Sequence, residues 1–327
     1  MDPMPRLSAM LVASLLLTAM LAGCAARPAT TATAAAPIDD ANVSTPVSPL
    51  AAERLDVWRR IHADGDRVPE GQRAEALLPE LERLLGASDP TVRDDLATSV
   101  LEVWIVRTKL LGPDTLRGLA GRLEARLMLT ANAGESDAVF GRSFSALVLA
   151  LVARRELDTP FLDDTGLTAL LAALTHYAAH ETDLRGYVEG RGWAHAPAHT
   201  ADALAVVAQH PRLGAEQATD ILDAVLGFTV RRHGFNLHHG EDSRLAQPVL
   251  VLVRRGIIDG APFQAFLVAL SAPLREPWPK VFDPALYAAQ RNARNLLYTL
   301  MVALSLMPTD DPHAASALQQ VRATISG

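Results

Sequence analysis

The chain has 327 residues, of which 49% are hydrophobic, and Lys+Arg 30 against Asp+Glu 37 gives a net charge of −7. This composition is ample for a buried core and indicates a folded, globular body. The acidic balance offers no electrostatic footprint for a phosphate backbone, so we expect no nucleic-acid partner. A single cysteine excludes a disulfide within one molecule.

The N-terminus has the pattern of a bacterial lipoprotein signal. Arg6 precedes an apolar run from Leu7 to Leu21, which has the length of a signal-peptide h-region and is short for a bilayer span of about 20 residues. The run ends in Leu-Ala-Gly-Cys, which resembles a lipobox, in which the cysteine is lipidated and becomes the first mature residue. The sequence therefore predicts a signal peptide over residues 1–23 and a lipid anchor on Cys24.

Ala25 follows the cysteine at the position where lipoproteins retained in the inner membrane typically carry aspartate. The resemblance therefore implies a cell-envelope protein that is anchored by acyl chains in the outer membrane and faces the periplasm. Residues 24–47 are rich in Ala, Thr and Pro and contain hardly any large apolar residue, which predicts a flexible tether. We expect one folded domain over residues 48–327.

From residue 48 onward the sequence signals are helical. The Asp-Pro pairs at 89–90, 283–284 and 311–312 each place a capping carboxylate before a proline that fits the first helical turn. Apolar residues recur at helical spacing between these starts, and no stretch alternates convincingly with the period of a strand. The expected helices are residues 49–63, 71–86, 89–110, 113–130, 137–156, 164–181, 196–209, 214–232, 241–256, 260–271, 284–306 and 311–325.

Helices of this length with short connections predict an all-α fold. We expect a right-handed α/α superhelix of antiparallel helix pairs, because pairs at roughly forty residues match the period of a HEAT-like solenoid. An irregular helical bundle is the alternative, since no repeat motif is visible at the level of single residues.

The stretch Asp183–Asp202 interrupts the helices with glycines and prolines. With residues 139–150 and 239–245, it resembles the bacterial family catalogued as domain of unknown function 2785, whose core pattern is Gly-Trp-Ala-His followed by Ala-His and Asp. The resemblance runs from about Leu55 to the C-terminus, implies no established activity, and is imperfect at Pro197, where we expect a larger apolar residue. It implies these signature positions: Arg142, Asp183, Arg185, Gly192, Trp193, His195, His199, Asp202, Glu241, Asp242 and Arg244.

Three of these residues suggest a metal site. At ~100° per residue, His195, His199 and Asp202 fall within roughly 60° of one another on a helix. Two imidazoles and a carboxylate are a ligand set that a divalent transition metal such as zinc takes, and Glu241 would then complete the set or act as general base. If Pro197 is the first helical residue, His195 leaves the stripe, and the histidines are then buried anchors bonded to backbone carbonyls.

The charged residues permit a second interpretation. Arg142 lies in a strongly apolar helix, and a buried guanidinium needs a carboxylate, which Asp183, Asp202 or Asp242 would supply. The other two signature arginines raise the same question. Together these groups form either a polar network that pins helices together or a pocket for an anionic or polar ligand.

Three functions therefore stay open, and with them whether the protein is an enzyme. The first is binding of a small polar ligand or a cell-envelope partner in a pocket formed by the signature side chains. The second is a metal-dependent hydrolase that uses His195, His199 and Asp202 as ligands and Glu241 as base. The third is an architectural scaffold without a small-molecule site.

Overall fold

The computed structural model describes residues 52–128, 134–231, 233–308 and 310–326. The predicted signal peptide, the lipidated Cys24 and the tether that ends at residue 47 lie outside the described residues. The described helices all belong to one unit of the chain, Val47–Gly327. Among them, none combines the length and apolar character that crossing a bilayer requires.

The described residues are mostly helical, which confirms the all-α prediction. The expected helices agree with the observed ones to within a few residues at their ends. The α-helices are α2 (Ala52–Ala63), α3 (Ala74–Leu84), α4 (Ser99–Glu102), α5 (Pro113–Met128), α6 (Ala138–Asp158), α7 (Asp164–His180), α8 (Ala196–Val207), α9 (Ala215–Thr229), α10 (Glu241–Arg254), α11 (Ala261–Ser271), α12 (Pro284–Ser305) and α13 (Pro312–Ser326).

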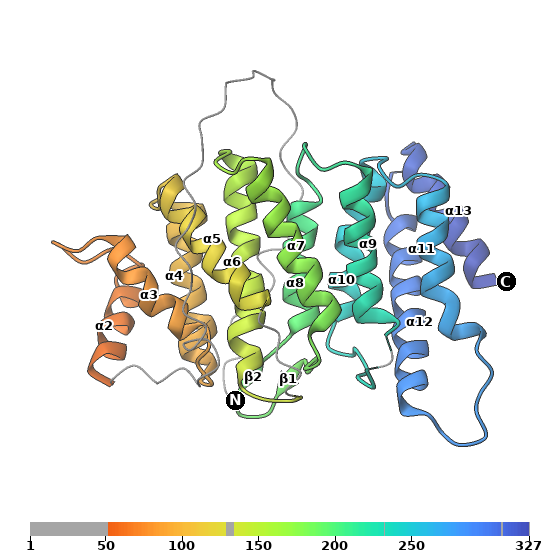
Figure 1. Cartoon of the computed structure of the whole chain (residues 1–327), viewed down its shortest axis with the longest axis horizontal. Coiled ribbons are helices and arrows are strands. Elements are labelled where there is room, and N and C mark those ends of the chain that lie inside the picture. The colour runs from red at the N-terminus through yellow and green to blue at the C-terminus, as the bar shows by residue number, and fades with distance from the viewer. Residues whose placement is uncertain (1–51, 129–133, 232, 309, 327) are drawn as a thin grey trace. The chain divides into compact units, whose positions relative to one another are not determined.

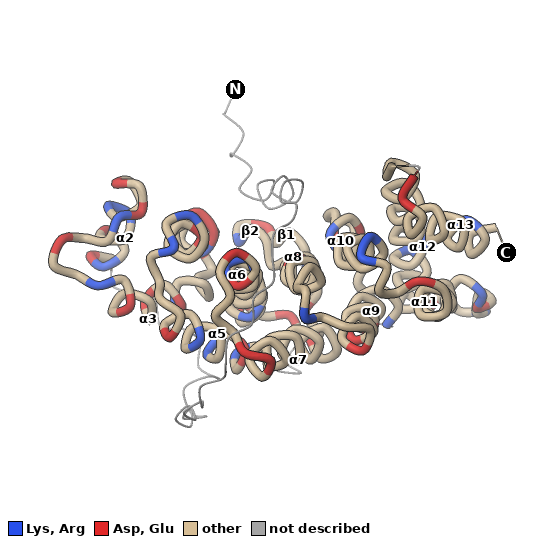
Figure 2. Tube along the Cα trace, turned by 90° about the horizontal axis from the view of Figure 1, so that it is seen from above, with Lys and Arg blue, Asp and Glu red and all other residues tan. Residues whose placement is uncertain are grey.

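The central helices stack in two rows (Figures 1 and 2). In one row α6 contacts α8, α8 contacts α10, and α10 contacts α12. In the other row α5 contacts α7, α7 contacts α9, and α9 contacts α11. Helices that follow one another in sequence thus lie in opposite rows, as pairs of stacked helices do. The right-handed twist and the HEAT-like character of this stack remain predictions.

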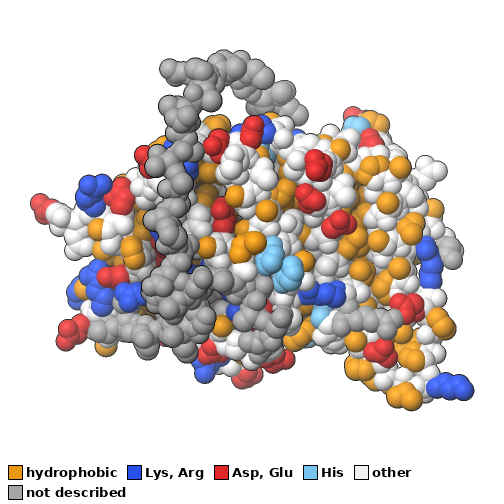
Figure 3. Space-filling model, viewed as in Figure 1, with side chains coloured by type: hydrophobic (Ala, Val, Ile, Leu, Met, Phe, Trp, Pro, Cys, Tyr) orange, Lys and Arg blue, Asp and Glu red, His pale blue; other side chains and the backbone are white. Residues whose placement is uncertain are grey.

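Figure 3 shows the face formed by the row of α5, α7, α9 and α11. Acidic, basic and apolar side chains are interspersed over this face, and apolar ones also cover the protruding loop before α12. On that loop Trp278 and Phe282 are 59% and 64% exposed. Most of the exposed large apolar side chains of the described residues lie between Val268 and Leu306, so they are concentrated towards the C-terminal end.

α8 positions the candidate site, and its composition explains its location. Its sequence, APAHTADALAVV, is apolar or small on every side, and a helix of this kind is stable only when neighbours cover its whole surface. All of its residues are buried, with α6 and α10 beside it and α7 in the opposite row. Its polar residues His199 and Asp202 must therefore find partners inside the protein.

Two features differ from the expected secondary structure. The helix expected over 89–110 contains two π-helical stretches, η4 (Thr91–Thr98) and η5 (Val103–Arg107), on either side of α4; a 3₁₀ turn, η6 (Ala272–Arg275), follows α11. The strands β1 (Tyr187–Val188) and β2 (Gly192–Trp193) form an antiparallel pair that we did not predict. Strands of two residues are too short to produce an alternating pattern, and π-helical turns have no separate sequence period.

Candidate functional site

Two glycines fix the position of the β1–β2 hairpin. At Gly192 φ is 73°, and a Cβ would lie 2.7 Å from Cβ of Pro90. At Gly186 a Cβ would overlap the ring of His239 and lie 2.8 Å from Oε1 of Glu241. Any larger residue would therefore push the hairpin away from η4 on one side and from the start of α10 on the other.

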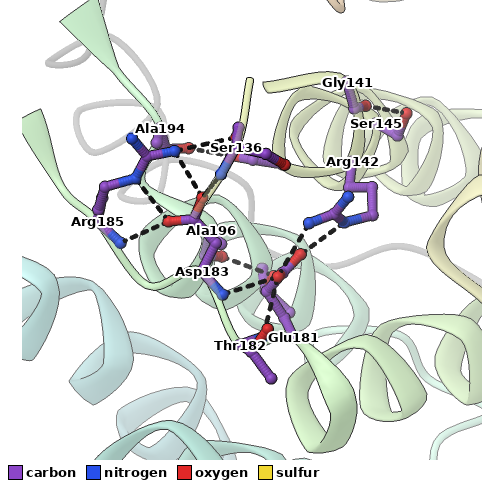
Figure 4. Close-up of polar contacts among 12 residues, drawn as sticks. Ser136, Gly141, Arg142, Ser145, Glu181, Thr182, Asp183, Arg185, Ala194 and Ala196 are labelled. Atoms are coloured by element: carbon purple, nitrogen blue, oxygen red, sulfur yellow. Dashed lines mark hydrogen bonds and ion pairs between the residues drawn. The ribbon is translucent and has the colours of Figure 1, made fainter. Parts of the chain in front are cut away.

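Arg142 of α6 belongs to a polar network with the residues that directly precede the hairpin in sequence (Figure 4). Its Nε and Nη2 donate to the Glu181 carboxylate at 2.6 and 3.0 Å, and both side chains are buried. Oε1 of Glu181 also accepts the backbone N–H groups of Thr182 and Asp183, each at 2.9 Å. Glu181, and none of the three aspartates that the sequence suggested, therefore neutralises Arg142.

The Asp183 carboxylate is engaged by a different arginine. Nε and Nη2 of Arg185 donate to its two oxygens at 2.8 and 2.6 Å, and the Ser136 N–H donates to Oδ2 at 3.0 Å. Arg185 also donates to the Ser136 carbonyl at 2.9 Å. We call Arg142, Glu181, Asp183, Arg185 and Ser136 the arginine–carboxylate network. It pins the start of α6 to the segment that leads into the hairpin.

A second, partly buried ion pair joins α8 to α10. Nε of Arg244 lies 2.5 Å from Oδ1 of Asp202, and Nη2 of Arg244 contacts Oδ2. Burial raises the pKa of Asp202, while the two contacts with Arg244 lower it. Asp242 instead accepts a hydrogen bond from Oγ1 of Thr299 on α12 at 2.5 Å. The signature aspartates thus serve separate helix contacts and do not converge on one point.

Five side chains do converge, and we call them the histidine cluster: Trp193, His195, His199, His239 and Glu241. The Trp193 and His195 rings are stacked with centroids 4.3 Å apart and an angle of 17°. His199 meets His195 edge-on at 5.9 Å, and His239 meets Trp193 edge-on at 5.6 Å. The cluster joins the hairpin to the N-terminal ends of α8 and α10.

His195 is strained and incompletely paired. It is the N-cap of α8 and has a left-handed backbone, with φ 53° and ψ 34°, a conformation that costs a non-glycine residue about 1–2 kcal/mol. Its Nε2 is buried without a hydrogen-bond partner among the described residues, although Oε1 of Glu241 lies 3.4 Å away. Backbone strain and unpaired buried polar atoms are both features that cluster at functional sites.

His199 is buried, as the alternative expected, but its ring is bonded to a serine hydroxyl and not to a backbone carbonyl. Its Nδ1 lies 2.7 Å from Oγ of Ser143. The Ser143 hydroxyl donates its proton to the carbonyl of Ala194, so Oγ accepts from Nδ1 of His199. Its ring packs edge-on against Phe144 with centroids 4.8 Å apart. Burial lowers the pKa of His199 well below its usual value, and the neighbouring His195 lowers it further. The ring is therefore neutral at pH 7.

Glu241 is a buried carboxylate in the first turn of α10. Its Oε2 accepts the backbone N–H of His239 at 2.7 Å, and its Oε1 lies 3.4 Å from Nε2 of His195 and 3.9 Å from Nδ1 of His239. Burial raises its pKa, but His195 and backbone N–H groups more than offset that effect and hold the pKa of Glu241 below its usual value. Glu241 is therefore an ionised acceptor between two imidazoles.

The predicted metal site is not present as a ligand set. No group of three or more His, Cys, Asp or Glu side chains in the described part of the chain is arranged to hold a metal ion. α8 begins only at Ala196, so His195 precedes the helix and does not lie on the stripe that suggested the site. Asp202 is bound by Arg244, and Nδ1 of His199 is bonded to Ser143.

Arg93 of η4 is a site residue that the sequence analysis missed. Its side chain is buried; Nη2 donates to the carbonyls of Arg191 and Trp193 at 2.7 and 3.2 Å, and the guanidinium lies 4.0 Å from the centre of the Phe140 ring. Burial lowers the pKa of Arg93 to about 10. These two hairpin carbonyls are 98 and 100 residues away in sequence, so no local pattern marks the contact. Glu181 and Ser143 were missed for the same reason.

Comparison with known proteins adds one match. A family model described as Protein of unknown function (DUF2785) matches residues 127–302, which contain the hairpin, the histidine cluster and the arginine–carboxylate network. This range is shorter than the expected one, and it leaves out Arg93. A search of curated proteins and a search of solved structures found no match. Because the family model covers more than half of the chain, the chain belongs to the DUF2785 family.

Proposed function

We propose that this protein is an outer-membrane lipoprotein whose helical domain binds a small polar ligand at the histidine cluster. His195 carries the proposal. Within the part of the chain that the structure describes, its buried Nε2 makes no hydrogen bond and only a 3.4 Å contact with Glu241, and its backbone is held in a strained conformation by the start of α8. An unmade hydrogen bond at a buried polar atom costs about 1–3 kcal/mol, which a ligand that supplies the missing partner recovers.

The neighbours of Nε2 define the ligand chemistry. With Nε2 protonated, His195 donates to an acceptor on the ligand. The ionised Oε1 of Glu241, which lies 3.4 Å from Nε2, accepts from a donor on the ligand. A hydroxyl group satisfies both, because its oxygen accepts from Nε2 and its hydrogen is donated to Oε1. The exposed Tyr187 ring, edge-on to Trp193 at 5.1 Å, offers an apolar surface beside this point. The ligand that fits is therefore a small polyhydroxylated molecule.

The cluster also reaches the surface. The side chains of its members His195 and His239 are 14% and 28% exposed, and the neighbouring Tyr187 is 51% exposed. His239 precedes Gly240, whose φ of 86° lets the chain turn sharply into α10.

A ligand screen in solution tests the proposal. Glycerol, monosaccharides and other small polyhydroxylated compounds are added at millimolar concentration, and the unfolding temperature is recorded. A bound compound at a hundredfold excess over its Kd stabilises the fold by about 2.7 kcal/mol. We expect this stabilisation to disappear in His195→Asn, because asparagine tolerates the left-handed backbone and the variant keeps its fold.

The matched control is His180→Gln, which removes an exposed histidine of α7 outside the cluster. It should bind the same compounds as the wild type. Compounds that still bind His195→Asn would show that the histidine cluster is not the site. A screen without any hit would favour the architectural scaffold, in which the cluster only holds α8 and α10 to the hairpin.

The envelope location is tested separately through Cys24. The lipobox resemblance predicts that the wild-type protein sediments with outer membranes and that Cys24→Ser is released into the soluble fraction. Equal sedimentation of the two proteins would contradict lipid anchoring and would leave the ligand proposal untouched.

A further inference from the structure

A second candidate site lies at the C-terminal end of the described residues, away from the histidine cluster. A cavity of about 360 Å³ opens among α11, η6, α12 and α13, which lie together in Figure 1. This volume falls within the range of small-molecule sites, roughly 300–1,000 Å³. Its lining includes Arg275, Arg294, Tyr298 and Thr324, and it contains no acidic residue.

The two arginines of this cavity differ from those near the hairpin. Arg142, Arg185 and Arg244 each pair with a carboxylate. Arg275 and Arg294 are both exposed, and among the described residues Arg275 donates to Oγ of Ser271 at 3.1 Å while Arg294 has neither a side-chain hydrogen bond nor an ion pair. Guanidinium groups have five N–H donors in a planar fork that matches carboxylate and phosphate oxygens. The cavity therefore has an excess of donors and positive charge.

The other side of the cavity is aliphatic. Leu297 is 1% exposed, and Leu274 and Ile325 are partly buried against the core. A free inorganic anion would leave this wall exposed to water. A ligand with a short hydrocarbon chain would cover it and gain about 0.8 kcal/mol for each CH₂ group that it buries, which is about fourfold in affinity.

We infer that this cavity binds an amphiphilic anion, with a phosphate or carboxylate head between Arg275 and Arg294 and an aliphatic tail against Leu297 and Ile325. The inference uses none of the residues of the histidine cluster. Either site can therefore be disproved without affecting the other, and His195→Asn should leave this binding unchanged.

Calorimetric titration with defined probes tests the inference. The chain from residue 24 onward, carrying Cys24→Ser, is titrated with octyl phosphate, octanoate, inorganic phosphate and octanol. We expect octyl phosphate to bind one molecule per chain at least tenfold more tightly than inorganic phosphate, and octanol not to bind measurably. Arg294→Gln should weaken octyl phosphate binding at least tenfold, because a charge-assisted bidentate contact is lost.

The matched control is Arg291→Gln, which removes the same charge from an exposed position on α12 outside the cavity lining. It should change the affinity less than twofold. Equal weakening by both substitutions would show general surface attraction and would overturn the inference, as would equal binding of octanol or the absence of binding by every probe.

Vesicles identify the source of the anion. Binding of the wild type, and not of Arg294→Gln, to vesicles of an anionic phospholipid would assign a lipid headgroup to the cavity. Binding of octyl phosphate without vesicle binding would assign a free small molecule instead.

Discussion

The arginine–carboxylate network and the histidine cluster lie at the two ends of the same hairpin segment, and they differ in how completely their polar atoms are paired. In the network, both arginines meet carboxylates with short bidentate contacts. In the cluster, Nε2 of His195 makes no hydrogen bond among the described residues and has only the longer 3.4 Å contact with Oε1 of Glu241, and the backbone that holds it is strained. A saturated network holds helices in place, whereas an unsaturated one keeps a binding position open. This difference is the reason for giving Glu181 a structural role and for proposing His195 as the ligand contact.

The largest expected effect on folding stability concerns the arginine–carboxylate network, in which the arginines are fully paired. Glu181→Ala leaves the Arg142 guanidinium buried without a carboxylate, since the two side chains are 0% and 7% exposed. Such a loss costs about 3–5 kcal/mol of folding stability. Urea unfolding at pH 7 measures it; if the alanine variant does not fold, Glu181→Gln is measured in its place.

The matched control replaces both partners. Arg142→Met with Glu181→Leu removes the pair without leaving a charge, and it should recover part of the lost stability, since the N–H groups of Thr182 and Asp183 still lose their acceptor. A cost below about 1 kcal/mol for Glu181→Ala would mean that water reaches Arg142, and the network would then lose its structural role.

A smaller effect is expected at the glycine between the two regions. Gly186→Ala places a Cβ against the His239 ring and 2.8 Å from Oε1 of Glu241, an overpacking that costs about 1–3 kcal/mol. It should also abolish ligand binding, because His239 and Glu241 must move. The control is Gly121→Ala on α5, where a Cβ meets nothing within 4 Å and helix propensity predicts a gain of up to about 1 kcal/mol.

The smallest effect is the pH dependence contributed by His199. Its pKa in the folded state is lowered below the usual 6.5 by burial, so the unfolded chain binds the proton more readily. The stability that this neutral ring contributes is fully present above about pH 6.5 and is lost as the pH falls from there toward the folded pKa. The loss approaches about 1.4 kcal/mol per pH unit.

His199→Gln removes this titration. Unfolding free energies measured from pH 7.5 to 5.0 should therefore fall less steeply for the variant than for the wild type. Other groups titrate in the same range, so only the difference between the two slopes reports on His199. Parallel curves would show that the ring is not kept neutral by burial.

The sequence predicted the helices well because each carries its own signals. Asp283 caps α12 with bonds to the N–H groups of Ala285 and Leu286, as the Asp-Pro pattern indicated. The helix expected over 196–209 corresponds to α8, with Pro197 in its first turn. The hairpin strands were missed because pairing between Tyr187 and Trp193 depends on a register that two-residue segments do not encode.

The sequence indicated which segments form the candidate site, but it did not indicate which side chains pair with one another there. Trp193, His195, His199 and Glu241 do meet, and they come from the segments that the family resemblance indicated. The partner of Arg142 was wrong, because contacts between helices are not fixed by spacing along the chain. His195, His199 and Asp202 do not share one helical face, and the reason is visible in the sequence. With Pro197 in its first turn, α8 begins only after His195.

The complete burial of α8 also predicts the order in which parts of the protein unfold locally. The amides of α8 cannot exchange with solvent until α6, α7 or α10 detaches, whereas the helices at the two ends of the stack have fewer neighbours to lose. Hydrogen exchange should therefore be slowest in this central block and fastest at the termini. Because His195 is the N-cap of α8, the proposed ligand contact borders the helix that is expected to open last.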